Sequence, residues 1–189
     1  MAPTINRSRL LIILLCVVIV IMMVQNYFLV RKNDELVKRV ERLIDETNRQ
    51  AIMQGGDSVR PFAVMKLDST FVVIDPTMKG KKLFLVFTTW CHACLQNMPE
   101  WTKLLKEIPR GDLNIVGLSS DLPYKIKEYR SKVNLSFPVY STANDSTMMK
   151  KYKLLLVPQT ILMDSSGLVI KVWPGVLSNE AKEEIKRAI

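Results

Sequence analysis

The chain has 189 residues, of which 48% are hydrophobic and 24% charged, and its formal net charge is +9. This balance excludes a disordered chain, and the length suits one ordinary domain plus an additional segment. Three cysteines are too few for a disulfide framework. No nucleic-acid-binding motif accompanies the positive charge, so we expect the basic residues to form a solvated surface. The alternatives are that they attract anionic lipid headgroups or an acidic partner protein.

The chain begins with a long apolar segment. Residues 10–24 form an unbroken apolar run, and residues 27–30 extend it. Crossing a bilayer takes about 20 such residues, so this stretch is long enough for a single pass through the lipid. No small-residue cleavage site follows, which favours an uncleaved signal anchor over a removable signal peptide. Cys16 lies inside the run, where we expect it to be a small apolar residue in lipid.

A polar, helix-forming segment follows the anchor. In residues 33–53 the apolar side chains of Leu36, Val40 and Leu43 recur at helical spacing. We expect a stalk that lifts the domain off the membrane, with homodimerisation through this stripe as the second reading. Glycines within 55–58 then end the helix and mark a linker. The predicted division is an anchor over 1–31, a stalk and linker over 32–58, and a domain over 59–189.

The remainder alternates strand and helix patterns. Strands are predicted over 62–67, 70–74, 83–88, 113–118, 137–140, 160–163 and 168–173. Helices are predicted from the motif after the third strand to about residue 108, over 123–133, over 147–152, and after a capping Ser178. The segment 83–88 is apolar throughout, which is typical of a central strand buried on both faces. This order predicts an α/β fold with a mixed sheet covered by helices.

Two thiols stand three residues apart where that apolar strand gives way to a helix. The motif is Cys91-His92-Ala93-Cys94, directly after Trp90. A helix N-terminus carries unpaired N–H groups and partial positive charge, and both stabilise a thiolate. The thiolate is the nucleophile of disulfide exchange, so the pattern predicts a redox pair.

The domain resembles the thioredoxin fold, and in particular the membrane-tethered TlpA-like thiol:disulfide oxidoreductases of bacteria. The resemblance is carried by Trp90 with the cysteine pair, by Pro99 within the following helix, by Val157-Pro158 before a strand, and by a glycine turn at 175–178. It covers roughly residues 61–189. Accessory proteins that mature methylamine dehydrogenase share this layout and are a candidate subfamily.

The resemblance implies a thioredoxin-like three-layer mixed sheet with flanking helices and an enzyme that exchanges disulfides with extracytoplasmic proteins. Cys91 would be the nucleophile and Cys94 the resolving thiol, with His92 tuning the pKa of Cys91. Trp90 and the Val157-Pro158 loop, with a cis bond, would bind substrate. No cofactor or metal is expected. Besides substrate thiols or disulfides and the bilayer, the expected partner is a membrane redox donor or acceptor protein.

The expected location is the bacterial inner membrane, with one span and the domain outside the cytoplasm. Positive residues near the span are more numerous on its C-terminal side, where Arg31 and Lys32 stand, than on its N-terminal side. The positive-inside rule alone would therefore keep the domain in the cytoplasm. We favour the opposite orientation because long domains translocate despite charge and because disulfides persist outside the cytoplasm.

The sequence departs from the family pattern at three positions. Ala93 stands where the family often has proline, Leu85 where thioredoxin-like proteins often keep a buried acid, and Asn97 where TlpA-like reductases often have glutamate. Both familiar proton-shuttling carboxylates are therefore missing. Water or His92 would have to accept the proton of the second thiol.

Two other function classes use similar residues. A copper-binding metallochaperone could draw on Cys91, His92, Cys94 and Met98 as soft ligands. A peroxiredoxin-like peroxidase needs a threonine three residues before its cysteine, as Thr88 stands here, but also a proline where this chain has Phe84. Disulfide exchange is the leading interpretation.

Overall fold

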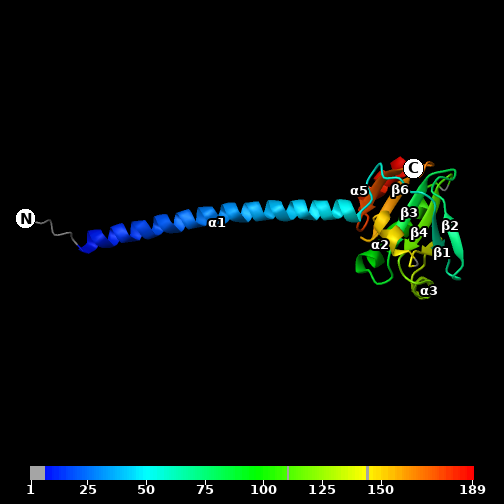
Figure 1. Ribbon diagram of the computed structural model, residues 1–189, viewed down its shortest axis with the longest axis horizontal. Coiled ribbons are helices and arrows are strands. Elements are labelled where there is room, and N and C mark those ends of the chain that lie inside the picture. The colour runs from blue at the N-terminus through cyan, green and yellow to red at the C-terminus, as the bar shows by residue number, and fades with distance from the viewer. Residues whose placement is uncertain (1–6, 110, 144) are drawn as a thin grey trace, which may run out of the picture. The chain divides into compact units, whose positions relative to one another are not determined.

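The computed structural model describes residues 7–109, 111–143 and 145–189, which fall into two compact units, Met1–Thr47 and Asn48–Ile189. The described residues of the first unit, 7–47, belong to one continuous helix, α1 (Arg7–Ala51), drawn in blue to cyan in Figure 1. The sequence had predicted an anchor over 1–31 and a helix over 33–53. The two are one helix because the polar residues between them include neither glycine nor proline, so nothing breaks the hydrogen-bond ladder.

α1 is long and apolar enough to cross a membrane by its length and composition. Its most apolar 18-residue window has a mean hydropathy of 2.7, and none of that window is buried within the protein. Large apolar side chains from Leu10 to Val30 are exposed along the helix. A protein rarely leaves so much apolar surface uncovered in water, so this segment could serve as a membrane anchor.

The second unit is built on one seven-stranded sheet of order β2-β1-β5-β4-β3-β6-β7. β3, β4 and β5 are parallel, whereas β1, β2, β6 and β7 join the sheet in antiparallel pairings. The strands are β1 (Phe62–Met65), β2 (Phe71–Ile74), β3 (Lys82–Phe87), β4 (Asn114–Ser119), β5 (Val139–Ser141), β6 (Gln159–Met163) and β7 (Val169–Pro174). The helices of this unit are α2 (His92–Glu107), α3 (Pro123–Lys132), α4 (Ser146–Lys151) and α5 (Asn179–Ala188).

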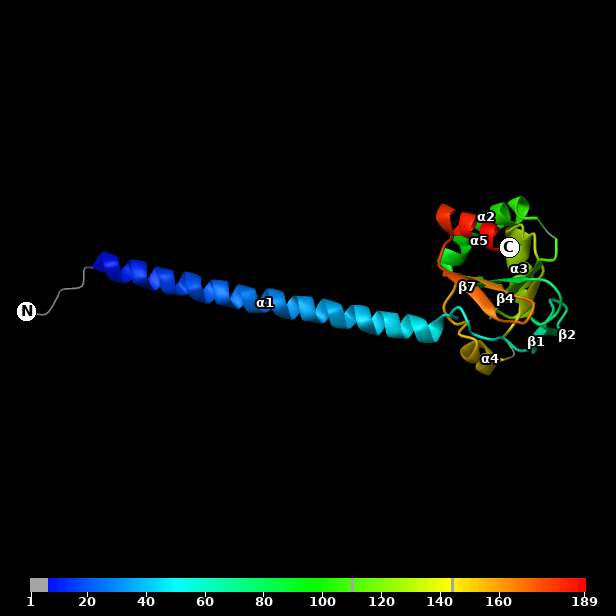
Figure 2. The same ribbon diagram turned by 90° about the horizontal axis from the view of Figure 1, so that it is seen from above.

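Side-chain alternation along β3 builds a core on each face of the sheet. Leu83, Leu85 and Phe87 pack with α2, α3 and α5, whereas Phe84 and Val86 pack with α4. Figure 2 shows α2, α3 and α5 on one side of the sheet and α4 on the other. The arrangement confirms the predicted three-layer mixed sheet, and full burial of β3 explains its uninterrupted apolar sequence.

The predicted elements are confirmed, with small shifts at their ends. The largest are of two residues: β1 ends at Met65 instead of Leu67, and β5 begins at Val139 instead of Phe137. Pro138 has no N–H to donate to a neighbouring strand, although its carbonyl accepts a hydrogen bond from Gly117 at 2.8 Å. Ser178 caps α5 as predicted, since its hydroxyl accepts the N–H of Ala181 at 3.2 Å.

Candidate active site

Cys91 occupies the N-cap of α2, directly past the turn that follows β3. Its backbone is extended, with φ −80° and ψ 116°, and its Sγ accepts a hydrogen bond from the N–H of Cys94 at 3.1 Å. A cysteine thus performs the capping role that serine or aspartate usually performs. The first thiol therefore lies against a free N–H at the positive end of the helix, an environment that favours its ionised form.

The two sulfurs differ in exposure. Cys91 is half-buried, whereas Cys94 is fully buried. Burial, with a smaller contribution from the hydrogen bond to Cys91, raises the pKa of Cys94 to about 12, while a backbone contact with Thr88 acts in the opposite direction. An external sulfur can therefore reach only Cys91, and Cys94 is a thiol at neutral pH.

A loop distant in sequence completes the surroundings of Cys91. The Sγ of Cys91 donates to the carbonyl oxygen of Val157 across 3.8 Å. The Val157–Pro158 peptide bond is cis, as expected from the sequence, and Pro158 is buried while Val157 is half-buried. The loop that precedes β6 and the N-terminus of α2 therefore meet at the reactive sulfur.

Trp90 and His92, the two neighbours of Cys91, both face solvent. Trp90 is 77% exposed, so its ring does not pack in the core, where most large apolar side chains are found. His92 is exposed as well, and its Nε2 lies 3.2 Å from Nε2 of Gln96. Trp90 is therefore available to a docking protein, while the imidazole of His92 lies outside the buried environment of Cys94.

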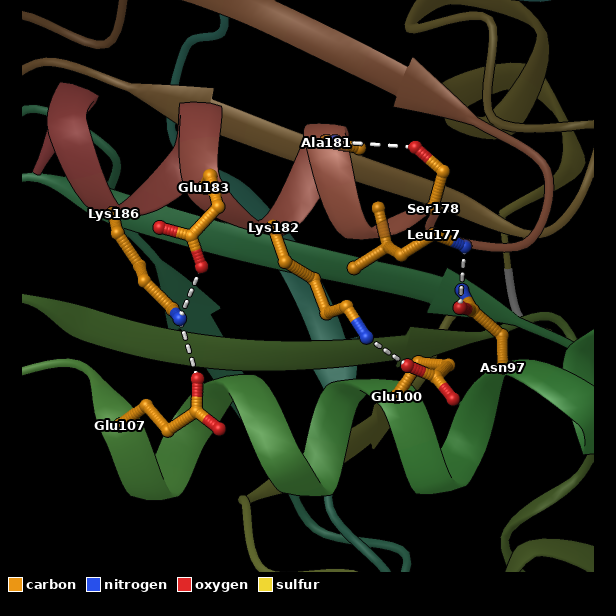
Figure 3. A network of polar contacts seen from close by, with 9 residues as sticks. All are labelled: Asn97, Glu100, Glu107, Leu177, Ser178, Ala181, Lys182, Glu183 and Lys186. Atoms are coloured by element: carbon orange, nitrogen blue, oxygen red, sulfur yellow. Dashed lines mark hydrogen bonds and ion pairs between the residues drawn. The ribbon is translucent and has the colours of Figure 1, made fainter.

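Asn97, one turn beyond Cys94, has a structural role. It is fully buried, its Oδ1 accepts the N–H of Leu177 at 2.9 Å, and its Nδ2 donates to the carbonyl of Gly175 at 3.5 Å. Figure 3 shows the first of these contacts between α2 and the turn before α5. The residue that replaces the family's glutamate therefore fastens the active-site helix to a distant turn.

Two ion pairs extend the same attachment along α2. Lys182 of α5 pairs with Glu100, and Lys186 pairs with Glu107 at 2.5 Å (Figure 3). The Lys182 side chain is almost fully buried, and a buried cation left without its partner would be destabilising, so the pair with Glu100 matters to the packing of α5 on α2. The hydrogen bond from Lys186 lowers the pKa of Glu107. These contacts hold the helix that carries both thiols.

Sequence reasoning missed Asp121. Its buried carboxylate accepts the N–H of Thr89 at 2.6 Å and the hydroxyl of Ser119 at 3.1 Å, and its charge contributes to the raised pKa of Cys94. A signal did exist, because Asp121 follows β4, the parallel neighbour of β3. The carboxyl ends of parallel strands meet at one edge of a sheet, which places this acid beside the cysteine motif.

Two buried hydroxyl groups near the thiols have no hydrogen-bond partner among the residues that the structure describes. They belong to Thr88 and Tyr129. The Tyr129 ring packs against Phe87 with centroids 6.1 Å apart. Burial raises the pKa of Tyr129, and the charges of Cys94 and Cys91 add to the shift.

The candidate copper ligands do not converge. No group of three or more His, Cys, Asp or Glu side chains suited to a metal occurs within residues 7–109, 111–143 and 145–189. Of the four residues considered, Cys94 and Met98 are buried whereas His92 is exposed. The described geometry therefore gives the metallochaperone reading no support.

Comparison with known proteins places the chain in a family. The AhpC/TSA family matches residues 56–172. The thiol-disulfide oxidoreductase ResA of Bacillus cereus is 27% identical over 144 residues, which span 75% of this chain and 82% of that protein. Among solved structures, StoA from Bacillus subtilis superposes with a TM-score of 0.56 at 19% identity, covering 69% of this chain and 98% of StoA. A peroxiredoxin-like protein from Aquifex aeolicus superposes with a TM-score of 0.59 at 16% identity, covering 73% and 89% of the two chains.

The fold and the thiol pair are those of a thioredoxin-like protein. The family match spans more than half of the chain, so the chain belongs to the AhpC/TSA family. The resemblance to thioredoxin-fold thiol:disulfide oxidoreductases that the sequence suggested is confirmed.

Proposed function

We propose that the protein is a membrane-tethered thiol:disulfide oxidoreductase that exchanges disulfides with other proteins through Cys91 and Cys94. The hydrogen bond from the Cys94 N–H to Cys91 Sγ carries the proposal, because it stabilises one accessible sulfur as a nucleophile beside a second, buried sulfur. The relatives named as thiol-disulfide oxidoreductases support the same reaction class.

In the reducing direction, the Cys91 thiolate attacks one sulfur of a substrate disulfide. A mixed disulfide forms and the other substrate sulfur leaves as a thiolate that takes up a proton. Cys94 then loses its proton and attacks Cys91 Sγ, so the Cys91–Cys94 bond forms and the second substrate thiolate departs. Two electrons pass from the cysteine pair to the substrate, and oxidation of a substrate runs through the same steps in reverse.

Deprotonation of Cys94 needs an acceptor, because burial holds its pKa far above neutrality. We assign that role to Asp121, whose buried carboxylate acts on Cys94 electrostatically. His92 is less suited because it faces solvent. His92 instead adds positive charge beside Cys91 when protonated, which favours the reduced pair. A lower reduction potential in His92→Gln, measured against glutathione, would support this role.

Substrate would lie across the surface formed by Trp90 and the Val157-Pro158 loop. The carbonyl of Val157 faces the Cys91 sulfur, so an extended chain bonded to Cys91 would run beside this backbone. The exposed Trp90 ring offers apolar contact area next to the same sulfur. The substrate class is therefore protein thiols or disulfides presented on accessible segments.

The tether defines where the reaction takes place. We retain the division into an anchor (1–31), a stalk and linker (32–58) and a domain (59–189), with one span in the bacterial inner membrane and the domain outside the cytoplasm. There, a membrane redox protein would restore the cysteine pair, and the exposed stripe of Leu36, Val40 and Leu43 would allow homodimerisation. An alkaline phosphatase fused after Ile189 is active only outside the cytoplasm, so a stable but inactive fusion would reverse the orientation.

A trapping experiment tests the exchange reaction. In Cys94→Ser the mixed disulfide on Cys91 cannot be resolved, so partner proteins should accumulate as adducts that reductant releases. The matched variant Cys91→Ser should trap none, and both should be made in a Cys16→Ser background because Cys16 is a third free thiol. Absence of adducts in Cys94→Ser would contradict the assigned roles. A peroxidase would instead consume hydrogen peroxide through Cys91. Measuring peroxide consumption by the same variants would detect that activity.

A further inference from the structure

A basic groove lies between α3 and the turn that joins β1 to β2. It has a volume of about 660 Å³, and Leu67, Val139 and Tyr140 are among the residues that line it. Three cations line it, namely Lys66 from the turn and Lys127 and Arg130 from α3. None of the residues of the cysteine site takes part, and β4 separates β5 from β3.

Lys127 and Arg130 have no acidic partner among the described residues, whereas hydrogen bonds with Thr70 and, to a smaller extent, the charge of Lys66 lower the pKa of Asp68. No side-chain hydrogen bond or ion pair joins Lys66, Lys127 or Arg130 to another part of the described chain, whereas Lys132 on the same helix pairs with Glu128 at 2.7 Å. The one carboxylate at the groove, Asp68, accepts the N–H and the hydroxyl of Thr70 at 2.9 and 2.6 Å. With three cations and one carboxylate along its lining, the groove carries a net positive charge.

β5 is an inner strand of the sheet, but its pairing on the groove side is incomplete. β1 pairs with β5 only through Met65 and Ser141. On its other side, β5 pairs with β4 through all three of its residues. Val139 and Tyr140 consequently have no strand beside them on the groove side. An incompletely paired strand accepts an extended peptide through main-chain hydrogen bonds, and neighbouring side chains then select the sequence.

We propose that this groove binds an extended acidic segment of a partner protein. Its backbone would run along the open side of β5, and its carboxylates would meet Lys66, Lys127 and Arg130. A protein segment fits these observations better than a membrane does, because the cations line a hollow beside a strand that is only partly paired on that side, whereas a bilayer presents a flat surface. The groove would bind an acidic partner while leaving the cysteine pair free to react.

Binding can be measured on the full chain in nanodiscs of neutral phosphatidylcholine. The probe is a short fluorescent peptide that alternates glutamate with valine, followed by anisotropy at low and high salt. We expect saturable binding that weakens with salt. Replacing Lys66, Lys127 and Arg130 together by glutamine should weaken binding about tenfold or more. Absence of saturable binding to the unaltered chain would overturn the proposal.

The control removes the same charge elsewhere. Lys125, Lys150 and Lys151 are exposed and do not line the groove, so their joint replacement by glutamine should leave binding intact. Equal loss in both triple variants would show that only overall charge matters and would overturn the groove assignment. A peptide methylated on alternate amide nitrogens should bind poorly, and undiminished binding would contradict strand addition.

Two further readouts separate the remaining outcomes. Vesicles of phosphatidylglycerol that displace the peptide through the same three cations would make lipid the occupant and overturn the proposal. The reaction of the cysteine pair with a chromogenic disulfide should be unchanged in the groove variant. If the unaltered chain does not react with the chromogenic disulfide, the exchange function is disproved. Peptide binding would still show whether the groove takes an acidic segment.

Discussion

The N–H of Cys94 donates to the Sγ of Cys91 over 3.1 Å, so the backbone of the second cysteine supports the first sulfur separately from the contact that the Cys94 side chain makes with Cys91. The two roles of residue 94 are therefore separable. Its amide stabilises the attacking sulfur, whereas its own sulfur is required only to resolve the mixed disulfide.

Replacing Cys94 by serine should leave Cys91 reactive. The amide remains, so the rate of Cys91 alkylation by iodoacetamide should stay within about threefold of the unaltered rate, because the helix-end environment that favours the thiolate is retained. Stopped-flow alkylation at neutral pH in a Cys16→Ser background measures it. A loss well beyond tenfold would show that the Cys94 side chain itself activates Cys91.

The buried thiol should react only in alkali. In Cys91→Ala, Cys94 is the sole domain thiol, and burial, the main cause of its pKa of about 12, persists. Its alkylation should therefore remain slow near neutrality and rise as pH increases toward 12, since the thiolate is the reactive form. The matched variant Cys94→Ala, which reports on Cys91, should react much faster at neutral pH. Fast alkylation of Cys94 at neutral pH would refute its burial.

Loss of the Asp121 charge should slow only the resolving step. Asp121→Asn keeps an oxygen for the N–H of Thr89 and the hydroxyl of Ser119 but removes the proton acceptor. With a chromogenic disulfide, release of the first thiolate should be unchanged and release of the second should slow about 10–100-fold. Asp112→Asn on the surface is the control. Equal rates in both variants would assign the proton to water.

Asn97 should contribute to stability. Asn97→Ala leaves the N–H of Leu177 without its partner, and a buried unpaired donor costs about 1–3 kcal/mol. Urea unfolding of the reduced protein measures the loss, with the exposed Asn134→Ala as a control that should stay within about 0.5 kcal/mol. If the two variants unfold alike, the contact between α2 and the Gly175 turn is not stabilising.

The Tyr129 hydroxyl should add no stability. It is buried without a described partner, so Tyr129→Phe keeps the packing on Phe87 and removes only an unpaired polar group. The change should be neutral or stabilising by up to about 1 kcal/mol. Tyr124→Phe, on the exposed side of the same helix, should have no effect. A clear destabilisation by Tyr129→Phe would reveal a hydrogen bond to that hydroxyl.

Local sequence pattern was sufficient for most of the fold. The apolar run of β3, the Ser178 cap and the turn between β6 and β7 each express a backbone preference within a few residues, so their elements were predictable. The continuity of α1 was not anticipated, because the helix after the anchor was predicted only from residue 33, although neither glycine nor proline separates the two segments.

The candidate site was predictable only where its residues form a motif. The cysteines and the Val157-Pro158 loop have sequence signatures, whereas Asp121 acquires its importance from the parallel pairing of β3 with β4. The attachment of Asn97 to Leu177 joins positions 80 residues apart. Contacts of that separation follow from the assembled sheet and cannot be seen in any short window of sequence.

The anchoring of α2 by α5 has a consequence for biosynthesis. Lys182 stands 82 positions after Glu100, so a growing chain exposes both thiols long before the clamp that steadies their helix has been made. Until then the cysteines belong to a loosely held segment with ordinary thiol chemistry. Nascent chains would therefore catalyse exchange poorly, and their cysteines could form wrong disulfides. Full activity would appear only once the final helix, α5, has folded.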